Sequence, residues 1–327
     1  MRCVVTGGAG FIGANLVRRL LQEPEIESIV VVDDLSSGSR ENLAGLDRTQ
    51  LLEGTILDAE LLDQAFAGAD AVVHLAARPS VSRSIEDPVA SHEANVTGTL
   101  RVLEALRRAG GLYTVVASSS SVYGSNPTLP KHEGLVAQPV SPYAASKLAA
   151  ESYALSYAHC FGLPVLVFRF FNVFGPLQPA GHAYAAVIPA FVSAALAGRP
   201  LPVHGDGRQT RDFTYVGSVT AVIADAVRRR VTSDGPVNLA FGSRRSLLAA
   251  IAELERVLGH AVEIRHTAPR PGDVRDSQAD QTRLHELFPD IEPFGFIEGL
   301  RATVEWLGQL DGRAEPHRLM SRTPGLH

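Results

Sequence analysis

The feature that most constrains the fold of this chain is a group of glycines between its first apolar run and its first helical pattern. The run Cys3–Thr6 is typical of a short buried strand, and apolar side chains recur with helical period from Ile12 to Gln22. Between them, Gly7, Gly10 and Gly13 are spaced three residues apart. In such a loop the first glycine permits a tight turn, the second lets the backbone approach a pyrophosphate, and the third lets helix and strand pack closely. The helix N-terminus favours negative charge, so this order predicts a dinucleotide-binding unit.

A second valine-rich run ends in two acidic residues, Asp33 and Asp34, about twenty residues after the last of these glycines. A carboxylate at this strand end can accept hydrogen bonds from the ribose hydroxyls of adenosine, and it would repel a 2′-phosphate. The sequence therefore predicts NAD rather than NADP. The alternative is a glycine turn followed by an unrelated acidic loop, which is disfavoured because both parts occur at the expected spacing.

Apolar runs and helical patterns alternate through the first half of the chain. Valine- and isoleucine-rich strands separated by helices are typical of a parallel sheet covered on both faces. We therefore expect an α/β fold with a Rossmann-type doubly wound sheet. The predicted strands are Cys3–Thr6, Ile29–Asp33, Ala71–Leu75, Tyr113–Ser118 and Val165–Phe170, and the predicted helices include Ile12–Gln22, Ala94–Arg108 and Tyr143–Phe161.

From about Gly175 onward, Gly and Pro interrupt the pattern more often, which indicates a smaller, loop-rich lobe. No polar linker precedes it, so we expect a dinucleotide-binding domain at residues 1–174 and a smaller α/β substrate-binding lobe at 175–310 packed directly on it. The stretch 311–327 is polar, holds two prolines and is expected to be a flexible tail.

The overall composition is that of a soluble globular protein, with 45% hydrophobic and 20% charged residues. A formal net charge of −5 argues against a general nucleic-acid binder, which would usually be basic. The two cysteines, Cys3 and Cys160, are expected to be buried free thiols. No signal peptide or membrane span is visible, so we expect a cytoplasmic protein without membrane contacts, and we assign no metal site.

Tyr143 and Lys147 are four residues apart at the start of a predicted helix, so they share one of its faces. An ammonium beside a phenol favours the phenolate, and we expect Lys147 to lower the pKa of Tyr143 and make it a base near neutral pH. Of the 30 basic residues only Lys131 and Lys147 are lysines, which indicates that an ammonium is required at this place. The alternative is that Tyr143 and Lys147 are simply an exposed pair of side chains on a helix, without a catalytic role. The preceding serines, residues 118–121, belong to the same site or simply form a polar strand end.

These motifs together resemble the UDP-hexose 4-epimerase branch of the extended short-chain dehydrogenase/reductase family. The resemblance covers roughly residues 1–310, and its motifs occur in the family's order. The matching stretches are Thr6–Gly13, Asp33–Gly38, His74–Ala77, Asn95–Thr99, the serines 118–121, Tyr143 with Lys147, Arg169–Gly175, Arg211–Phe213 and Arg270–Asp273.

The resemblance implies a role for each matching residue. Ser119 matches the catalytic serine that hydrogen-bonds the sugar 4-hydroxyl, Tyr143 matches the base, and Lys147 matches its partner on the nicotinamide ribose. A tightly bound NAD is expected to contact Gly7, Gly10, Phe11, Ile12, Gly13, Asp33, Asp34, Ser37, Gly38, Ile56, Asp58, Leu75, Ala76 and Ala77, besides Tyr143 and Lys147. A UDP-sugar is expected to contact Ser119, Ser120, Ser121, Tyr143, Asn172, Val187, Arg211, Arg270, Asp273 and Ser277.

Two parts of this assignment keep an alternative. Arg211 and Arg270 suit a diphosphate because a guanidinium binds phosphate oxygens in pairs, but each could instead form a surface salt bridge. The family often has Gly-Asp after the third strand, where the Asp contacts adenine, whereas this chain has Gly54-Thr55 and then Asp58. Thr55 offers a hydroxyl instead, which leaves the adenine contact open.

The resemblance also bears on the reaction. Sugar 4,6-dehydratases carry Asp-Glu where this chain has Ser120-Ser121, and UDP-glucuronate decarboxylases carry Glu at the position of Ser121. Without these acids we expect a reversible cycle that inverts C4 of a UDP-hexose through a 4-keto sugar. A UDP-glucuronate 4-epimerase, a dehydratase or a nucleotide-sugar reductase on the same scaffold stays open, and so does a non-catalytic NAD-binding sensor. The family's glucuronate 4-epimerases often have Thr where Asn172 stands, which weighs slightly against that reading.

Two further expectations concern assembly and sugar size. The helices at 88–108 and 142–161 resemble those that pair two subunits through a four-helix bundle, so we expect a homodimer, although these faces would also suit an ordinary core. In resembling epimerases the position of Ser277 lines the sugar pocket, and a small residue there admits a 2-acetamido group. We therefore expect UDP-GlcNAc and UDP-GalNAc to be accepted, unless other side chains such as Pro79 close the pocket.

Overall fold

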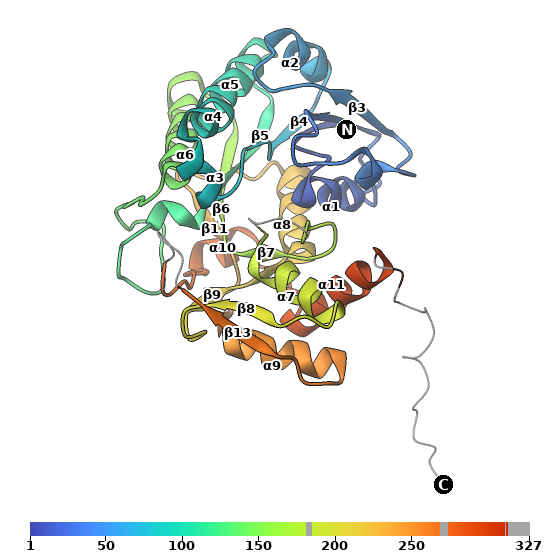
Figure 1. Cartoon of the computed structure of the whole chain (residues 1–327). Coiled ribbons are helices and arrows are strands. Elements are labelled where there is room, and N and C mark those ends of the chain that lie inside the picture. The colour runs from blue at the N-terminus through green and yellow to red at the C-terminus, as the bar shows by residue number, and fades with distance from the viewer. Residues whose placement is uncertain (181–184, 269–273, 311, 313–327) are drawn as a thin grey trace.

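The structure is a computed structural model, which describes residues 1–180, 185–268, 274–310 and 312. A sheet with helices on both sides forms the upper part of the molecule in Figure 1, and a smaller lobe lies below it. The predicted Arg270, Asp273 and nearly all of the predicted tail 311–327 lie outside the described residues.

Seven parallel strands form the large sheet, in the order β11-β6-β5-β4-β1-β2-β3. The order turns at β1, which is the arrangement of a doubly wound Rossmann-type sheet. All five strands predicted in the first half are present. The strands of this sheet are β1 (Arg2–Thr6), β2 (Ser28–Asp33), β3 (Thr49–Glu53), β4 (Ala71–His74), β5 (Tyr113–Ser119), β6 (Val165–Phe170) and β11 (Val237–Leu239).

Helices cover both faces of the sheet because its strands are apolar on both sides. On one face Cys3 and Val5 of β1 pack against α1 (Phe11–Leu20) and α8 (Val216–Arg229). On the other face Val4 packs with α2 (Ala59–Phe66), α5 (Gly98–Arg108) and α6 (Pro142–Phe161). The central strands are thereby buried, and their carboxyl ends face the smaller lobe.

The smaller lobe has its own apolar core. Phe174, Phe213 and Phe296 form a cluster with ring centroids 5.2–6.4 Å apart, and residues of three helices complete the core. Its elements are β7 (Val173–Phe174), α7 (Val187–Leu196), β8 (Leu201–His204), β9 (Thr210–Asp212), β10 (Thr214–Tyr215), β12 (Arg244–Ser246), α9 (Leu247–Leu258), β13 (Ile264–Thr267) and α11 (Phe296–Leu310).

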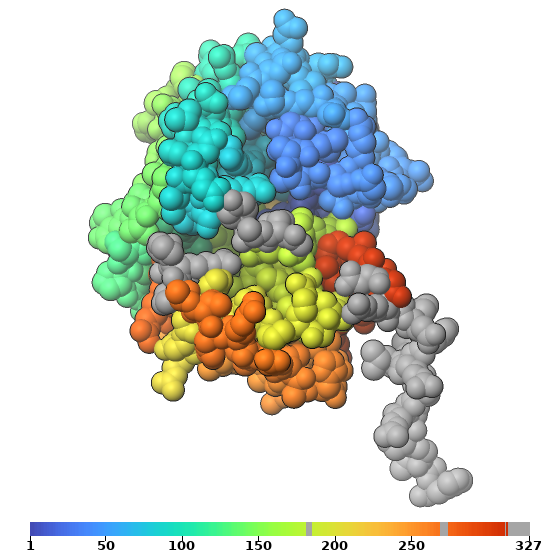
Figure 2. Space-filling view, in the orientation of Figure 1, coloured from blue at the N-terminus to red at the C-terminus, as the bar shows by residue number. Residues whose placement is uncertain are grey.

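A single boundary after residue 174 is predicted between the large sheet and the smaller lobe, but the chain returns to the large sheet after that point. The predicted boundary places the segment containing α8 and β11 in the second lobe, but α8 packs against α1 and β11 extends the large sheet beside β6. The smaller lobe is therefore not one continuous stretch. This interleaving ties the two parts together, and Figure 2 shows the early (blue to green) and late (yellow to orange) parts of the chain in contact.

Short helical segments complete the described chain. They are η1 (Arg40–Leu43), α3 (Val81–Glu86), α4 (Pro88–His92), η2 (Glu93–Thr97), η3 (Ser120–Tyr123) and α10 (Thr282–Leu287), and η2 is one turn of π-helix. In the described part of the chain, no helix is both long and apolar enough to cross a bilayer. Of the two cysteines, Cys3 is buried as expected, but Cys160 is exposed near the end of α6. The prediction was wrong for Cys160 because the last three residues of α6, 159–161, are all exposed.

Candidate active site

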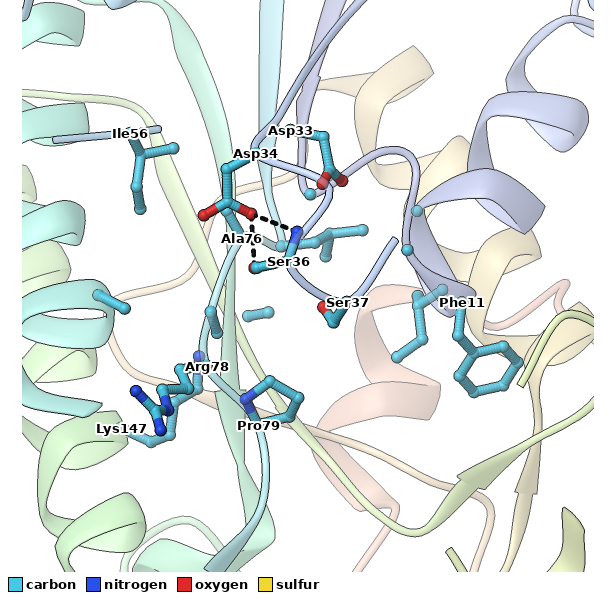
Figure 3. A pocket seen from close by; sticks show the side chains of 18 of the residues that line it. Phe11, Asp33, Asp34, Ser36, Ser37, Ile56, Ala76, Arg78, Pro79 and Lys147 are labelled. Atoms are coloured by element: carbon cyan, nitrogen blue, oxygen red, sulfur yellow. Dashed lines mark hydrogen bonds between the residues drawn. The ribbon is translucent and has the colours of Figure 1, made fainter. Parts of the chain in front are cut away.

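A cavity of about 770 Å³ runs from the glycine loop to the N-terminal end of α6. Figure 3 shows Asp33 and Asp34 at one end of the view and Lys147 toward the other. Of the predicted contacts, the cavity lining includes Gly7, Gly10, Phe11, Ile12, Gly13, Asp33, Asp34, Ser37, Ile56, Leu75, Ala76, Ala77, Ser119, Tyr143, Lys147 and Asn172. Residues from separate strand ends are thus brought into one site, as expected at the carboxyl edge of a parallel sheet.

The glycine loop has the close approaches that its sequence predicts. Gly7 has a φ of +72°, and a Cβ atom on it would lie 2.7 Å from the backbone nitrogen of Ala76. A Cβ atom on Gly13 would lie 2.1 Å from the carbonyl oxygen of Gly7. Side chains at either position would push the helix or the following loop away from the strand.

The first helix is suited to hold an anion. Gly10 is its N-cap, no side chain caps this end, and its first turn holds no acidic residue. The first backbone N–H groups of α1 therefore keep their hydrogen-bonding capacity, and the positive end of the helix dipole points into the cavity. This is what the diphosphate of NAD requires, so the residues present fit the cofactor.

The two acidic residues after β2 have different surroundings. Asp33 is 8% exposed, and its two carboxylate oxygens accept hydrogen bonds from the backbone nitrogens of Ala9 and Leu35, each at 2.9 Å. Burial raises the pKa of Asp33, and these hydrogen bonds oppose the rise. Asp34 is exposed, and its Oδ1 accepts from the backbone nitrogen of Ser36 at 2.9 Å (Figure 3). Asp33 thus fixes the glycine loop as well as facing the cavity.

Two predicted cofactor contacts do not line this cavity. Gly38 packs against the glycine loop, where a Cβ atom would lie 2.7 Å from the carbonyl carbon of Ala9. Asp58 is the N-cap of α2, and its carboxylate accepts from the backbone nitrogens of Glu60 and Leu61 at 3.0 and 3.2 Å. The structure therefore gives Asp58 a helix-capping role, whereas Thr55 does line the cavity.

The predicted catalytic residues meet at the other end of the cavity. Ser119 ends β5, while Tyr143 and Lys147 lie one turn apart on α6. This helix begins at Ser141, whose hydroxyl accepts from the backbone nitrogen of Ala144 at 3.1 Å, and Pro142 occupies the first turn. Both are strong signals for a helix start, so the position of Tyr143 follows from local sequence.

The acid–base properties differ from the sequence expectation. Burial raises the pKa of Tyr143 above its ordinary value, and the hydrogen bond with Ser119 opposes this rise. Burial lowers the pKa of Lys147 to about 8, with the charge of Glu151 acting in the opposite direction. The expected lowering of the Tyr143 pKa by Lys147 is therefore wrong for the protein alone, because spacing on a helix face cannot reveal how deeply a site is buried.

Ser119 has a defined orientation. Its Oγ accepts hydrogen bonds from the backbone nitrogen of Ser121 at 3.2 Å and from the Ser121 hydroxyl at 2.9 Å. Its own hydroxyl proton is thereby left to point toward Tyr143 or a substrate oxygen. Ser120 and Ser121 themselves do not line the described cavity.

The remaining predicted substrate contacts lie in the smaller lobe or at its edge. Asn172 lines the cavity and has a backbone φ of +21°. Val187 is the first residue of α7 and is not among the residues that line the cavity. Arg211 donates to the carbonyl oxygens of Thr210 and Arg275 at 2.8 and 3.1 Å. Ser277 donates its backbone nitrogen to the Thr210 carbonyl at 3.1 Å, and like Arg211 it is not in the described lining. Their contacts with a substrate stay predictions.

The structure adds a buried histidine, His74, for which the sequence indicated no role. The Nδ1 atom of His74 lies 2.7 Å from the hydroxyl of Thr6, and its Nε2 atom lies 3.0 Å from the hydroxyl of Thr99. Thr99 donates to the carbonyl of Asn95 at 2.6 Å, so it accepts from Nε2–H. Burial, helped by the charge of Lys147, lowers the pKa of His74 to about 3. A neutral histidine thus ties β1, β4 and α5 together behind the cavity.

The other lining residues were not assigned as contacts from the sequence, although Thr55 and Pro79 were named there as alternatives. They are Val32, Ser36, Gly54, Thr55, Leu57, Arg78, Pro79, Arg83, Ala90, Glu93, Ala94, Ala117, Ser118, Phe170, Val173 and Gln178. Most lie within two or three residues of a recognised motif, and this proximity was the only feature of the sequence that could have indicated that they line the cavity. The second lysine, Lys131, is 4% exposed and donates to the carbonyl of Asn126, so it is a buried structural residue.

The doubly wound sheet, the glycine loop and the Ser–Tyr–Lys set define a Rossmann-type enzyme of nicotinamide chemistry. The profile of the NAD dependent epimerase/dehydratase family matches residues 3–240, and the chain belongs to this family. NAD is therefore its cofactor.

Three similar proteins narrow the comparison. A UDP-glucose 4-epimerase of Mycolicibacterium smegmatis is 39% identical over 94% of this chain and 98% of its own length. The structure of a UDP-N-acetylglucosamine 4-epimerase from Methanobrevibacter ruminantium, in complex with UDP-N-acetylmuramic acid, has a TM-score of 0.89 at 34% identity, covering 94% of this chain and 98% of that one. A UDP-glucuronic acid 4-epimerase from Bacillus cereus, in complex with UDP-glucuronic acid and NAD, has a TM-score of 0.87 at 29% identity, covering 95% and 100%.

Proposed function

We propose that the protein is an NAD-dependent epimerase that inverts C4 of a UDP-hexose, either UDP-glucose and UDP-galactose or their N-acetylated counterparts. The observation that carries this proposal is the set Ser119, Tyr143 and Lys147 at one end of a cavity whose opposite end suits a dinucleotide. The similarity to 4-epimerases that act on different UDP-sugars supports the reaction while leaving the sugar open.

Each catalytic residue has one task. Tyr143 removes the proton of the sugar 4-hydroxyl and later returns it, and Ser119 donates a hydrogen bond to the same oxygen. Lys147 supplies positive charge that favours the phenolate of Tyr143. When bound, NAD supplies the acceptor and donor of the C4 hydride, and its positively charged ring also favours the phenolate. This explains how a tyrosine that burial keeps protonated in the protein alone can act as the base.

Inversion requires the 4-keto sugar to turn over within the site before it is reduced on its opposite face. The enzyme then ends each turnover as it began, and no net oxidation occurs. NAD should consequently stay bound through many turnovers.

The carboxylates of the cavity argue against an irreversible dehydration. Among its described lining residues the acids are Asp33, Asp34 and Glu93, and the first two lie at the glycine-loop end. The positions where dehydratases of the resembling family carry Asp-Glu are Ser120 and Ser121 here, on η3. Glu93 of η2 is the remaining acid of the described lining, and neither position that carries an acid in the dehydratases carries one here.

A uronic acid substrate is the second candidate. Arg78 and Arg83 both line the cavity, and a guanidinium is well suited to bind a carboxylate. Arg78 also donates to Asp87 at 3.3 Å across a partly exposed pair, which leaves it able to exchange partners. UDP-glucuronate must therefore be compared directly with the neutral sugars.

We also propose that the protein is a homodimer. The helices α4 and α6 expose large apolar side chains, including Val89 at 66%, Tyr153 at 40% and Phe161 at 53%. Light scattering after size exclusion would test this, and a monomeric mass at micromolar concentration would refute it.

The function is tested by incubating the purified protein with UDP-glucose, UDP-galactose, UDP-GlcNAc, UDP-GalNAc and UDP-glucuronate. Proton NMR of the anomeric and C4 positions distinguishes inversion from dehydration, and Tyr143→Phe is the control for contaminating activity. Inversion of a hexose without loss of water is expected. A product that has lost water, or net oxidation of the sugar, would refute the proposal.

A further inference from the structure

Helix α6 carries a third ionisable side chain on the face that holds Tyr143 and Lys147. Glu151 follows Lys147 by four residues, so the three side chains lie along one side of the helix. Glu151 is 3% exposed and Lys147 is 6% exposed. A buried carboxylate is unfavourable unless its oxygens are paired, so the partners of Glu151 indicate what it does.

Both oxygens of Glu151 are engaged from the neighbouring strands. Its Oε1 accepts from Nη2 of Arg169 at 2.6 Å, and its Oε2 accepts from Nε of Arg169 at 3.0 Å. The hydroxyl of Ser118 also donates to Oε2, at 2.7 Å. Ser118 directly precedes Ser119 at the end of β5, and Arg169 lies on β6. Glu151 therefore links the catalytic helix to the ends of two strands.

The guanidinium of Arg169 is itself fixed. Arg169 is 4% exposed, and its guanidinium carbon lies 4.7 Å from the ring centroid of Tyr123. The hydroxyl of Tyr123 donates to Oδ1 of Asn238 at 2.6 Å, which holds the ring in place. Glu151 thus cannot turn away from the strands without leaving a buried arginine unpaired.

We propose that Glu151 is a positioning residue for the reaction: through Arg169 and Ser118 it sets α6 against the end of β5, and its negative charge acts on Lys147 along the helix face. This inference rests on the proposed function only in so far as Lys147 is needed as an ammonium. Because both carboxylate oxygens are already engaged, Glu151 acts on Lys147 through space.

The surroundings of Lys147 make this charge important. The ionisable groups facing the pair are Tyr143 on α6, His74 on β4 and Arg169 on β6, while Arg83 of α3 and Glu93 of η2 line the same cavity. His74 is neutral above acidic pH and cannot compensate a positive charge. Burial lowers the pKa of Lys147 to about 8, and Glu151 is the acidic group that opposes this lowering.

Removing the charge should make Lys147 lose its proton at lower pH. In Glu151→Gln the alkaline limb of the kcat profile should move to lower pH, and activity at pH 8 should fall several-fold relative to pH 7. The KM for the UDP-sugar should change little, because Glu151 does not line the cavity.

The chain allows a direct measurement, because it has only two lysines, Lys131 and Lys147. Protein labelled with ¹³C at lysine Cε should give two signals, and Lys131→Arg assigns them. The Lys147 signal is titrated in wild type, Glu151→Gln, Glu151→Asp and the matched control Glu104→Gln, all with NAD bound. Glu104 also touches α6, accepting from the hydroxyl of Tyr157 at 2.6 Å, but at the end far from Lys147.

We expect the Lys147 titration to move to lower pH in Glu151→Gln and to stay near wild type in Glu151→Asp and Glu104→Gln. Glu151→Gln leaves Arg169 buried and unpaired, which can unfold a protein. The double variant Glu151→Gln, Arg169→Met removes both charges and should fold, and its Lys147 titration should lie below that of Arg169→Met, from which it differs only in the charge of residue 151.

A Lys147 titration that matches wild type in Glu151→Gln, or that matches Arg169→Met in the double variant, would overturn the inference, even if the variants lose thermal stability. Equal shifts in Glu151→Gln and Glu151→Asp would show that shape rather than charge matters, and would overturn it as well. The titration needs no turnover. Absence of epimerisation in wild type would therefore refute the proposed function separately.

Discussion

Acidification should destabilise the fold through His74, and the structure fixes both the sign and the size of the effect. His74 is 3% exposed, and its two ring nitrogens bond the hydroxyls of Thr6 and Thr99. Its pKa falls from an ordinary 6.5 to about 3 because of burial and the nearby charge of Lys147. Between these values the unfolded chain binds a proton that the folded protein excludes. The contribution of the neutral His74 to the free energy of unfolding is therefore fully present above pH 6.5 and is lost progressively as the pH falls toward 3.

The magnitude follows from the same two values. Between pH 8 and pH 5, protonation of one histidine in the unfolded chain alone lowers the free energy of unfolding by about 2 kcal/mol. This is a considerable part of the stability of an ordinary domain. Burial raises the pKa of Asp212 to about 6, which opposes this loss below that pH, so the contribution of His74 has to be isolated by comparing variants.

The assay is urea unfolding at pH 8 and pH 5 with saturating NAD. The drop in unfolding free energy between the two pH values should be about 2 kcal/mol smaller in His74→Gln than in wild type. The control His260→Gln makes the same replacement at an exposed position and should keep the wild-type drop. Equal drops in His74→Gln and wild type would show that His74 is not held neutral, and would refute the assignment.

Three further changes test the site. Tyr143→Phe should keep NAD bound but reduce turnover by about 10²–10⁴-fold, measured as initial rate together with cofactor content, and near-normal turnover would remove Tyr143 from the mechanism. Asp33→Ala should weaken NAD binding about 10–100-fold and narrow the preference over NADP, because two backbone N–H groups lose their acceptor as well; tighter binding of NADP than NAD by wild type would contradict this. Ser277→Tyr should lower kcat/KM for UDP-GlcNAc and UDP-GalNAc selectively, and an equal loss for the unacetylated sugars would exclude Ser277 as the gate.

The sequence predicted best what depends on local spacing. The strand, glycine loop and helix at Gly7–Gly13 and the start of α6 before Tyr143 are confirmed, because caps and turns are determined by neighbouring residues. The sequence predicted poorly what depends on the tertiary fold. The return of α8 and β11 to the large sheet, the capping role of Asp58 and the exposure of Cys160 required knowledge of what packs on each segment.

Burial explains why the charges behind the cavity had to be seen in the structure. A site that excludes water penalises every charge within it, so each must be neutralised, paired or lost. His74 is neutral, Glu151 is paired with Arg169, and Asp33 is held by two backbone N–H groups. Lys147 has no such partner among the described residues in hydrogen-bond or salt-bridge reach, and its pKa lies close to neutral pH as a consequence. The protonation of this one lysine is therefore the property of the site most easily changed by its surroundings, which is why a residue that touches neither substrate nor cofactor can set the pH range of the reaction.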